Sequence, residues 1–336
     1  MQVRIGEGTY EWVDDWATLP DAEGARGAWP HSAIVWSRKG ELWTFHPAKS
    51  AAIAFDADGH FLRAVPSPLS EAHGITLVEE GGTEFLWMAD ASTKRKPESN
   101  YDAPESADSA AVVKTDLAGR VVLALAPPPH PAYEKGPYRP TWVGVNEERF
   151  GGNGDIWVAD GYGQSLVHRY SADGRYQSTL TGEEGGGRFR GPHLAFVDRR
   201  RERPELYIAD RGNSRIQVYD LDGSFRRIVG AGTLSSPTAF AVEGERMVVL
   251  EFRPPRLLVF DGQDRLTDLV GENLGPLTQP GFPFVRDEAG HPSVPKQMGS
   301  GKFGIPHSVA IDGGGSLYFT EVVFGSRFTK LKRLPP

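Results

Sequence analysis

Three histidines stand at the same point of three similar stretches of the sequence. His73 opens HGITL, His193 is the second residue of PHLAF, and His307 is the second residue of PHSVAI. Imidazole nitrogens are good ligands for zinc, copper, nickel and cobalt, and a site with three of them keeps a coordination position open for water or substrate. If the fold brings the three side chains together, they can hold one catalytic divalent metal ion, with zinc as the first candidate.

A repeat supplies the strands that would position these histidines. Strands of one type recur in LWTFH (42–46), LWMAD (86–90), IWVAD (156–160), LYIAD (206–210), VVLEF (248–252) and LYFTE (317–321). Each follows another short apolar strand, and five of them precede a third strand and a turn rich in Asp and Gly, residues that suit tight turns. Six units of four antiparallel strands predict an all-β fold, a six-bladed β-propeller.

The sixth unit stops after its third strand, FTKLKRL. The N-terminal segment GTYEWVDDW is expected to supply the missing outer strand and so to close the ring. We therefore expect a single domain over residues 1–336, with insertions at about 93–109 and 271–303. The first insertion is polar and is expected to form a mobile surface loop. The second directly precedes the His307 motif, and it is either a lid or a passive excursion.

The predicted fold explains why the three histidines would converge. In a propeller the first strand of each blade lines the central channel, so equivalent positions in alternate blades lie about 120° apart around the axis. The three histidines open blades 2, 4 and 6, whereas blades 3 and 5 carry Thr141 and Thr238 at that position. Blade 1 has His31 there, an additional channel residue that would be a fourth ligand or a nearby base. The alternative is that all of these histidines are only hydrogen-bonded in the channel.

Composition excludes several classes of function. The 336 residues carry a net charge of −7, which gives no broad attraction to nucleic acid or anionic lipid. There is no cysteine, so no disulfide or thiolate ligand exists, and any metal must be held by nitrogen and oxygen. No run of 18 apolar residues occurs and the N-terminus does not resemble a signal peptide. We expect a cytoplasmic monomer that binds neither nucleic acid nor membrane and acts on a small molecule.

Other charged and aromatic residues are expected to be structural. Strand ends carry carboxylates in one register, which indicates hydrogen bonding within the repeat; they are Asp90, Asp160, Asp210 and Glu321. Tryptophans recur in the second strands and indicate blade core; they are Trp43, Trp87 and Trp157. The basic run Arg199-Arg200-Arg201 is flanked by acidic residues and is expected to be a solvated hairpin loop.

Part of the sequence resembles the NHL-repeat propeller of the peptidyl-α-hydroxyglycine α-amidating lyase family. The stretches that carry this resemblance are IWVADGYGQSLVHRYSADGRY, FRGPHLAFV, LYIADRGNSRIQVYDLDG and IPHSVAIDGGGSLYF. The resemblance implies that His73, His193 and His307 bind zinc. It also implies that Tyr162, of the DGY motif, is the catalytic base and that Arg211 contributes to the site.

The chain departs from that family at three positions, one of which is Ile305, where the family has methionine. Pro47 follows His46 where the family has a reactive-centre arginine, and Ser308 stands where the family has an aspartate that helps to hold calcium. A small hydroxylated or unsaturated metabolite is therefore a better candidate substrate than a peptidyl-α-hydroxyglycine.

Three classes of function are open to this sequence. The first is a metal-dependent lyase that cleaves or forms a C–N or C–O bond at a hydroxyl-bearing carbon. The second is a metal-dependent hydrolase of the lactonase type, or a hydratase, and the third is a non-catalytic NHL binding propeller. The co-occurrence of three histidines with Tyr162 favours an enzyme, and the family resemblance favours the lyase.

Overall fold

Six antiparallel sheets contain the strands of the computed structural model, which describes residues 1–19, 24 and 27–335. Five sheets have four strands and one has five. Each sheet is one blade, and the predicted all-β, six-bladed β-propeller fold is confirmed. No helix among the described residues is long and apolar enough to cross a membrane.

Contacts divide the chain into two compact units of three blades each. Unit 1 comprises residues 1–64, 94–103 and 238–336, and unit 2 comprises residues 65–93 and 104–237. The single domain over residues 1–336 remains a prediction, and the units are described separately.

Unit 2 contains blades 2, 3 and 4, and their strands pair in chain order. Blade 2 consists of β7 (Gly74–Glu80), β8 (Thr83–Asp90), β9 (Ala111–Asp116) and β10 (Val121–Leu125). Blade 3 consists of β11 (Trp142–Val145), β12 (Ile156–Asp160), β13 (Leu166–Tyr170) and β14 (Tyr176–Leu180). Blade 4 consists of β15 (Pro192–Asp198), β16 (Glu205–Asp210), β17 (Arg215–Asp220) and β18 (Phe225–Val229). The connections include the short 3-10 helices η2 (Pro131–Glu134), η3 (Glu148–Phe150) and η4 (Arg211–Asn213).

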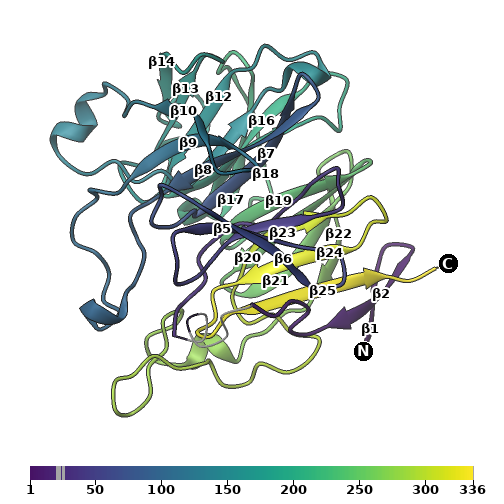
Figure 1. Ribbon diagram of the computed structural model, residues 1–336. Helices are drawn as coiled ribbons and strands as arrows, with labels where there is room; N and C mark the ends of the chain where they lie inside the picture. The colour runs from purple at the N-terminus through teal and green to yellow at the C-terminus, as the bar shows by residue number, and fades with distance from the viewer. Residues whose placement is uncertain (20–23, 25–26, 336) are drawn as a thin grey trace. The chain divides into compact units, whose positions relative to one another are not determined.

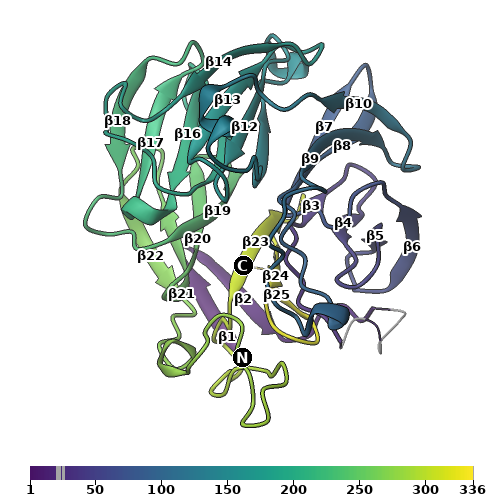
Figure 2. The ribbon, with the colours of Figure 1, turned by 90° about the vertical axis from the view of Figure 1, so that its left-hand side faces the viewer.

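Unit 1 contains blades 1, 5 and 6, and Figure 2 shows the strands of blade 1 side by side. Blade 1 consists of β3 (Val35–Trp36), β4 (Leu42–Phe45), β5 (Ala51–Phe55) and β6 (Phe61–Pro66). Blade 5 consists of β19 (Pro237–Glu243), β20 (Arg246–Phe252), β21 (Pro255–Phe260) and β22 (Leu266–Val270). Blade 6 consists of β23 (Pro306–Ile311), β24 (Leu317–Glu321), β25 (Arg327–Arg333), β2 (Gly8–Val13) and β1 (Gln2–Ile5). The 3-10 helices η1 (Pro97–Ser99) and η5 (Pro276–Thr278) lie in the two insertions.

The N-terminal segment completes blade 6, as predicted. Strand β2 pairs antiparallel with β25, with Tyr10 opposite Arg333 and Val13 opposite Lys330. Figure 1 shows the purple N-terminal strands beside the yellow C-terminal strand. Strand β1 adds a fifth strand outside β2, which the repeat did not predict because the other blades stop at four.

Neighbouring blades pack apolar faces against each other. Trp87 of blade 2 belongs to a buried cluster with the apolar residues of β11 and β12, and Trp157 of blade 3 belongs to the next cluster, with residues of blade 4. Trp43, Trp87 and Trp157 are all fully buried, so their predicted place in the blade core is confirmed.

The basic run at residues 199–201 is not the solvated loop that its charges predict. The Arg200 side chain is fully buried, and its Nη2 lies 3.0 Å from Oδ2 of Asp198, at the end of β15. The guanidinium also lies 5.6 Å from the centre of the Tyr207 ring. A buried carboxylate needs a countercharge, and the short hairpin turns Arg200 inward to supply it.

Part of the first insertion, residues 94–103, packs against other parts of unit 1, and its mobility remains a prediction. Tyr101 makes edge-to-face contacts with Trp29 and Phe324, both with ring centres 5.7 Å apart. Arg286 donates from Nη2 to the carbonyl oxygen of Asn100, at 2.7 Å. An aromatic side chain and a backbone carbonyl thus both tie residues 94–103 to unit 1.

The second insertion, residues 271–303, is also tied down. The side-chain amide of Asn273, which is buried, donates to the carbonyl oxygens of Gln297 (3.1 Å) and Phe303 (2.9 Å). These bonds close the segment on itself, and they do not decide between a lid and a passive excursion.

The attachment of β2 is testable through Tyr10, which is fully buried and whose hydroxyl accepts a hydrogen bond from Arg246 at 3.0 Å. Tyr10→Ala should lower the free energy of unfolding by about 3–5 kcal/mol, because it leaves a cavity in blade 6. Chemical denaturation measures this loss. Glu11→Ala changes an exposed neighbour on the same strand and should cost less than about 0.5 kcal/mol. Equal effects of the two substitutions would show that β2 is not locked in the sheet.

Candidate active site

Tyr162 lies in the turn that leaves β12, and Asp160 organises this turn. Asp160 is fully buried, and its carboxylate accepts hydrogen bonds from the backbone N–H groups of Arg139 (2.7 Å) and Gln164 (2.6 Å). The backbone N–H of Tyr162 donates to the carbonyl oxygen of Arg139, at 3.4 Å. One buried carboxylate therefore ties the turn to the neighbouring segment and limits where Tyr162 can point.

Steric crowding explains why the second residue of the DGY motif is glycine. A Cβ atom at Gly161 would lie 2.5 Å from the carbonyl oxygen of Pro192 and 2.9 Å from Oγ1 of Thr141. Both distances are too short for a carbon atom, so only glycine lets the turn pass this close to the backbone of blade 4.

The Tyr162 hydroxyl lies between two of the predicted histidines. Its oxygen is 3.1 Å from Nε2 of His73 and 3.3 Å from Nε2 of His193. Both imidazoles are fully buried, and their ring centres are 4.8 Å apart. The structure thus brings residues 120 positions apart in the sequence to one phenol oxygen, within unit 2.

A carbonyl of the next blade fixes the tautomer of His73. The Nδ1 atom of His73 lies 2.8 Å from the carbonyl oxygen of Thr141. A carbonyl oxygen only accepts, so Nδ1 carries the hydrogen and Nε2 of the neutral ring has the lone pair. The Tyr162 hydroxyl therefore donates to His73, and a metal ion bound at the same Nε2 atom would replace this hydrogen bond.

Arg211 is the fourth residue of this group. It is the first residue of η4, directly after β16, and its Nη1 donates to the Tyr162 hydroxyl oxygen at 3.3 Å. The guanidinium lies 5.2 Å from the centre of the Tyr162 ring. A cation at this point could bind an anionic group of a substrate.

The other two predicted channel residues meet in unit 1. His31 and His307 have ring centres 4.8 Å apart, and His307 is the more deeply buried. Nδ1 of His307 lies 3.2 Å from the carbonyl oxygen of Ser32, which repeats the arrangement of His73 and Thr141. His31, His73 and His307 each offer a ring nitrogen that could serve as a metal ligand. The joint set of His73, His193 and His307 remains a prediction.

The strand-end carboxylates have the structural role that the repeat predicts. All four are fully buried, and each accepts at least one backbone N–H; they are Asp90, Asp160, Asp210 and Glu321. Glu321 also pairs with Arg327, and Asp210 with Arg215.

Sequence reasoning missed several residues around the Tyr162 hydroxyl. Trp142 lies beside both imidazoles, with ring centres 6.4 Å from His73 and 6.3 Å from His193. It directly follows Thr141, whose backbone carbonyl fixes His73. The alignment of the first strands placed Thr141 at the position of the histidines. Nothing else in the sequence indicated that Thr141 or Trp142 lies near the candidate site.

A buried polar network lies behind the Tyr162 turn. The Tyr133 hydroxyl lies 2.8 Å from the Asp160 carboxylate and 2.5 Å from Nε2 of His168. Burial raises the pKa of Asp160 to about 6, and burial lowers the pKa of His168 to about 3. His168 is therefore neutral at physiological pH, and the network joins the candidate site to the core of blade 3.

Comparison with known proteins supports the fold and the repeat type. No protein-family model matches the chain. Human NHL repeat-containing protein 3 (Homo sapiens) is 26% identical over 219 residues, which are 62% of this chain and 57% of that protein. The chain thus spans little more than half the length of this curated relative.

Solved structures share the architecture over almost the whole chain. Streptogramin B lyase has a TM-score of 0.56 and 11% identity, and it covers 97% of this chain and 98% of its own. A catalytically inactive His-to-Ala variant of virginiamycin B lyase from Staphylococcus aureus, solved with quinupristin, has a TM-score of 0.58 and 12% identity, over 97% and 100% of the two chains. A protein of unknown function from Bacteroides thetaiotaomicron has a TM-score of 0.59 and 11% identity, over 91% and 70%. At these identities the similarity is one of fold, and it agrees with the six-bladed β-propeller of this chain.

Variants of Asp160 and His168 should show opposite pH dependences of stability. The pKa of Asp160 is raised from 3.8 to about 6, so its stabilising contribution is complete below its ordinary pKa and is lost as the pH rises through about 6. The pKa of His168 is lowered from 6.5 to about 3, so its contribution is complete above 6.5 and is lost as the pH falls. Between about pH 4 and 6 the two slopes oppose each other, each at about 1.4 kcal/mol per pH unit.

In that window the free energy of unfolding of Asp160→Asn should rise with pH relative to the wild type, and that of His168→Gln should fall. Denaturant unfolding at a series of pH values measures both. His291→Gln removes an exposed histidine and should leave the wild-type profile unchanged. Parallel profiles for the two buried variants would contradict the assigned pKa values.

Proposed function

We propose that the protein is a metal-dependent lyase that breaks or forms a C–N or C–O bond at a hydroxyl-bearing carbon of a small molecule. The observation that carries this proposal is the position of the Tyr162 hydroxyl, in contact with His73, His193 and Arg211. A phenol oxygen held between two imidazoles and a guanidinium is suited to moving a proton. The resemblance to the amidating-lyase family and the fold shared with streptogramin B lyase agree with this class.

The histidines suit a divalent metal ion, with zinc as the first candidate. His73 has its Nδ1 hydrogen committed to Thr141, so the lone pair of Nε2 is on the side of Tyr162. His193 presents its Nε2 to the same oxygen, and His307 remains the predicted third ligand. When bound, the ion would act as a Lewis acid that polarises an oxygen of the substrate.

Tyr162 is proposed as the base. The substrate hydroxyl gives its proton to the phenolate oxygen, and the electron pair of the O–H bond forms a carbonyl group. The C–N or C–O bond then breaks, and the leaving nitrogen or oxygen takes up a proton. The N–H of Arg211 that is directed at the Tyr162 oxygen helps to hold this oxygen in place.

Arg211 also gives the site a preference for acidic substrates. Its guanidinium has donors beyond the one that it gives to Tyr162, and a substrate carboxylate could accept them. The pair Tyr162 and Arg211 would then orient the hydroxyl-bearing carbon next to the base.

The substrate is best sought with a panel. Hemiaminals and hydroxy acids represent the proposed reaction, and lactones represent the hydrolase alternative. Quinupristin belongs in the panel because a structure with the same fold, a variant of virginiamycin B lyase, was solved with it. If the metal-loaded protein turns over none of these compounds, the non-catalytic binding propeller becomes the favoured alternative.

Tyr162→Phe is the decisive variant for the lyase. It keeps the ring but removes the proton acceptor, so turnover of the best substrate should fall by about 10²–10⁴-fold. Metal content, measured by elemental analysis of the same preparations, should not change. Tyr219→Phe removes a buried hydroxyl elsewhere in unit 2, one that donates to Gln217, and should retain near wild-type activity. Lactone hydrolysis that persists in Tyr162→Phe would favour a hydrolase over the proposed lyase. Activity that persists after complete metal chelation would exclude a metal-dependent mechanism.

A further inference from the structure

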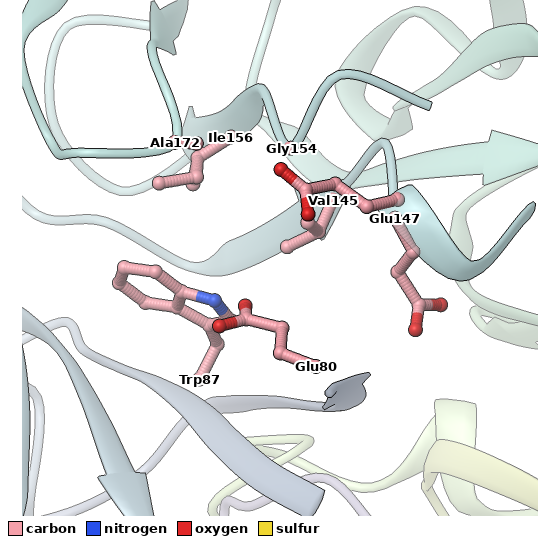
Figure 3. A pocket seen from close by; sticks show the side chains of 8 residues that line it. Glu80, Trp87, Val145, Glu147, Gly154, Ile156 and Ala172 are labelled. Carbon is pink, nitrogen blue, oxygen red and sulfur yellow. The ribbon is translucent and has the colours of Figure 1, made fainter. Parts of the chain in front are cut away.

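A second pocket lies in unit 2, far from Tyr162. It sits between blades 2 and 3, and Figure 3 shows side chains that line it. Its lining includes Glu80, Trp87, Val145, Glu147, Glu148 and Ile156. Strand β7 runs from the residue after His73 to Glu80, and seven residues of strand span about 23 Å. The pocket is therefore distinct from the candidate active site.

The indole N–H of Trp87 is buried in this pocket without a partner. Trp87 is 1% exposed, and its Nε1 has no hydrogen-bond acceptor among the residues that the structure describes. Trp43 is at the equivalent position of blade 1, and its indole donates to Glu41, two residues earlier, at 3.1 Å. In blade 2 the residue two before Trp87 is Phe85, which has no acceptor. Trp157 also has an unpaired buried indole, but of the two only Trp87 lines this pocket, so at Trp87 a molecule bound in the pocket can supply the acceptor.

The carboxylates of the pocket are only partly neutralised. Glu80 pairs with Lys114, and Glu147 pairs with Arg149 at 2.7 Å. Glu148 is exposed and has no ion-pair partner in the described part of the chain. Three carboxylates line the pocket, and only those of Glu80 and Glu147 have a cationic partner among the described residues, which leaves the negative charge of Glu148.

We propose that this pocket binds a small organic monocation that carries a primary ammonium group and a nearby oxygen, as an amino alcohol does. The ammonium group would donate to the glutamates and balance the residual charge, and the oxygen would accept the Trp87 N–H. A bare metal ion does not fit as well, because it leaves the indole without an acceptor. The cavity, of about 70 Å³, holds a ligand of only a few heavy atoms. This inference does not depend on the proposed lyase activity.

Ethanolamine is the probe, and the indole N–H signals of the ¹⁵N-labelled full-length protein are the readout. The chain has eight tryptophans, and Trp87→Phe assigns the signal of interest by its disappearance. Trp157 provides the internal control, because its indole is also buried and without an acceptor among the described residues, yet it does not line this pocket. Trp157→Phe assigns that signal. Ethanolamine at neutral pH should give a saturable shift of the Trp87 signal and leave the Trp157 signal in place.

Two analogues separate charge from hydrogen bonding. Ethylammonium lacks the oxygen and ethylene glycol lacks the charge, so both should bind more weakly than ethanolamine. Glu148→Gln removes an exposed carboxylate without stranding a buried partner, and it should weaken ethanolamine binding about fivefold. No saturable shift of Trp87, equal binding of either analogue, or unchanged affinity in Glu148→Gln would each overturn the proposal.

Discussion

The hydrogen bond from His73 Nδ1 to the carbonyl oxygen of Thr141 is the interaction on which the candidate site depends. It decides which imidazole nitrogen carries hydrogen, and therefore which lone pair is directed at Tyr162. The acceptor is a backbone atom of the next blade, so the orientation of the ring follows from blade packing and not from a side chain that one substitution could remove. The same arrangement, with Ser32 as the acceptor, holds His307 in unit 1. The propeller thus orients its histidines through its own backbone.

A second constraint places Tyr162 beside these rings. The buried carboxylate of Asp160 holds the turn by backbone hydrogen bonds, and Gly161 lets the turn pass close to Pro192. Asp90 and Asp210 hold the corresponding turns of blades 2 and 4 in a related way. The repeat therefore supplies a carboxylate-held turn in blades 2, 3 and 4, and in blade 3 this turn carries the phenol of Tyr162.

The sequence predicted the architecture and selected candidate site residues, but it did not show their surroundings. The recurrence of strands such as IWVAD and LYIAD predicts six blades, and the incomplete last unit predicts that β2 pairs with β25. His73 and His193 were selected by their position in the repeat, and Tyr162 and Arg211 by the resemblance to the amidating-lyase family. Trp142 could not be selected from the sequence, because a strand pattern does not show which aromatic ring packs against an imidazole. The burial of Arg200 could not be predicted either, because a run of charged residues does not show that one of them pairs with a buried carboxylate, here Asp198.

The central claim is that these imidazoles present Nε2 lone pairs that bind one metal ion. The direct measurement is the ¹⁵N NMR of the histidine side chains in metal-free protein, before and after one equivalent of Zn²⁺. We predict that His73 and His307 have the hydrogen on Nδ1 at neutral pH, and that Zn²⁺ shifts the Nε2 signals of His73, His193 and His307. The exposed His60, which pairs with Asp56, should not respond. Hydrogen on Nε2 of His73, or a Zn²⁺ addition that leaves all three Nε2 signals unchanged, would contradict this account.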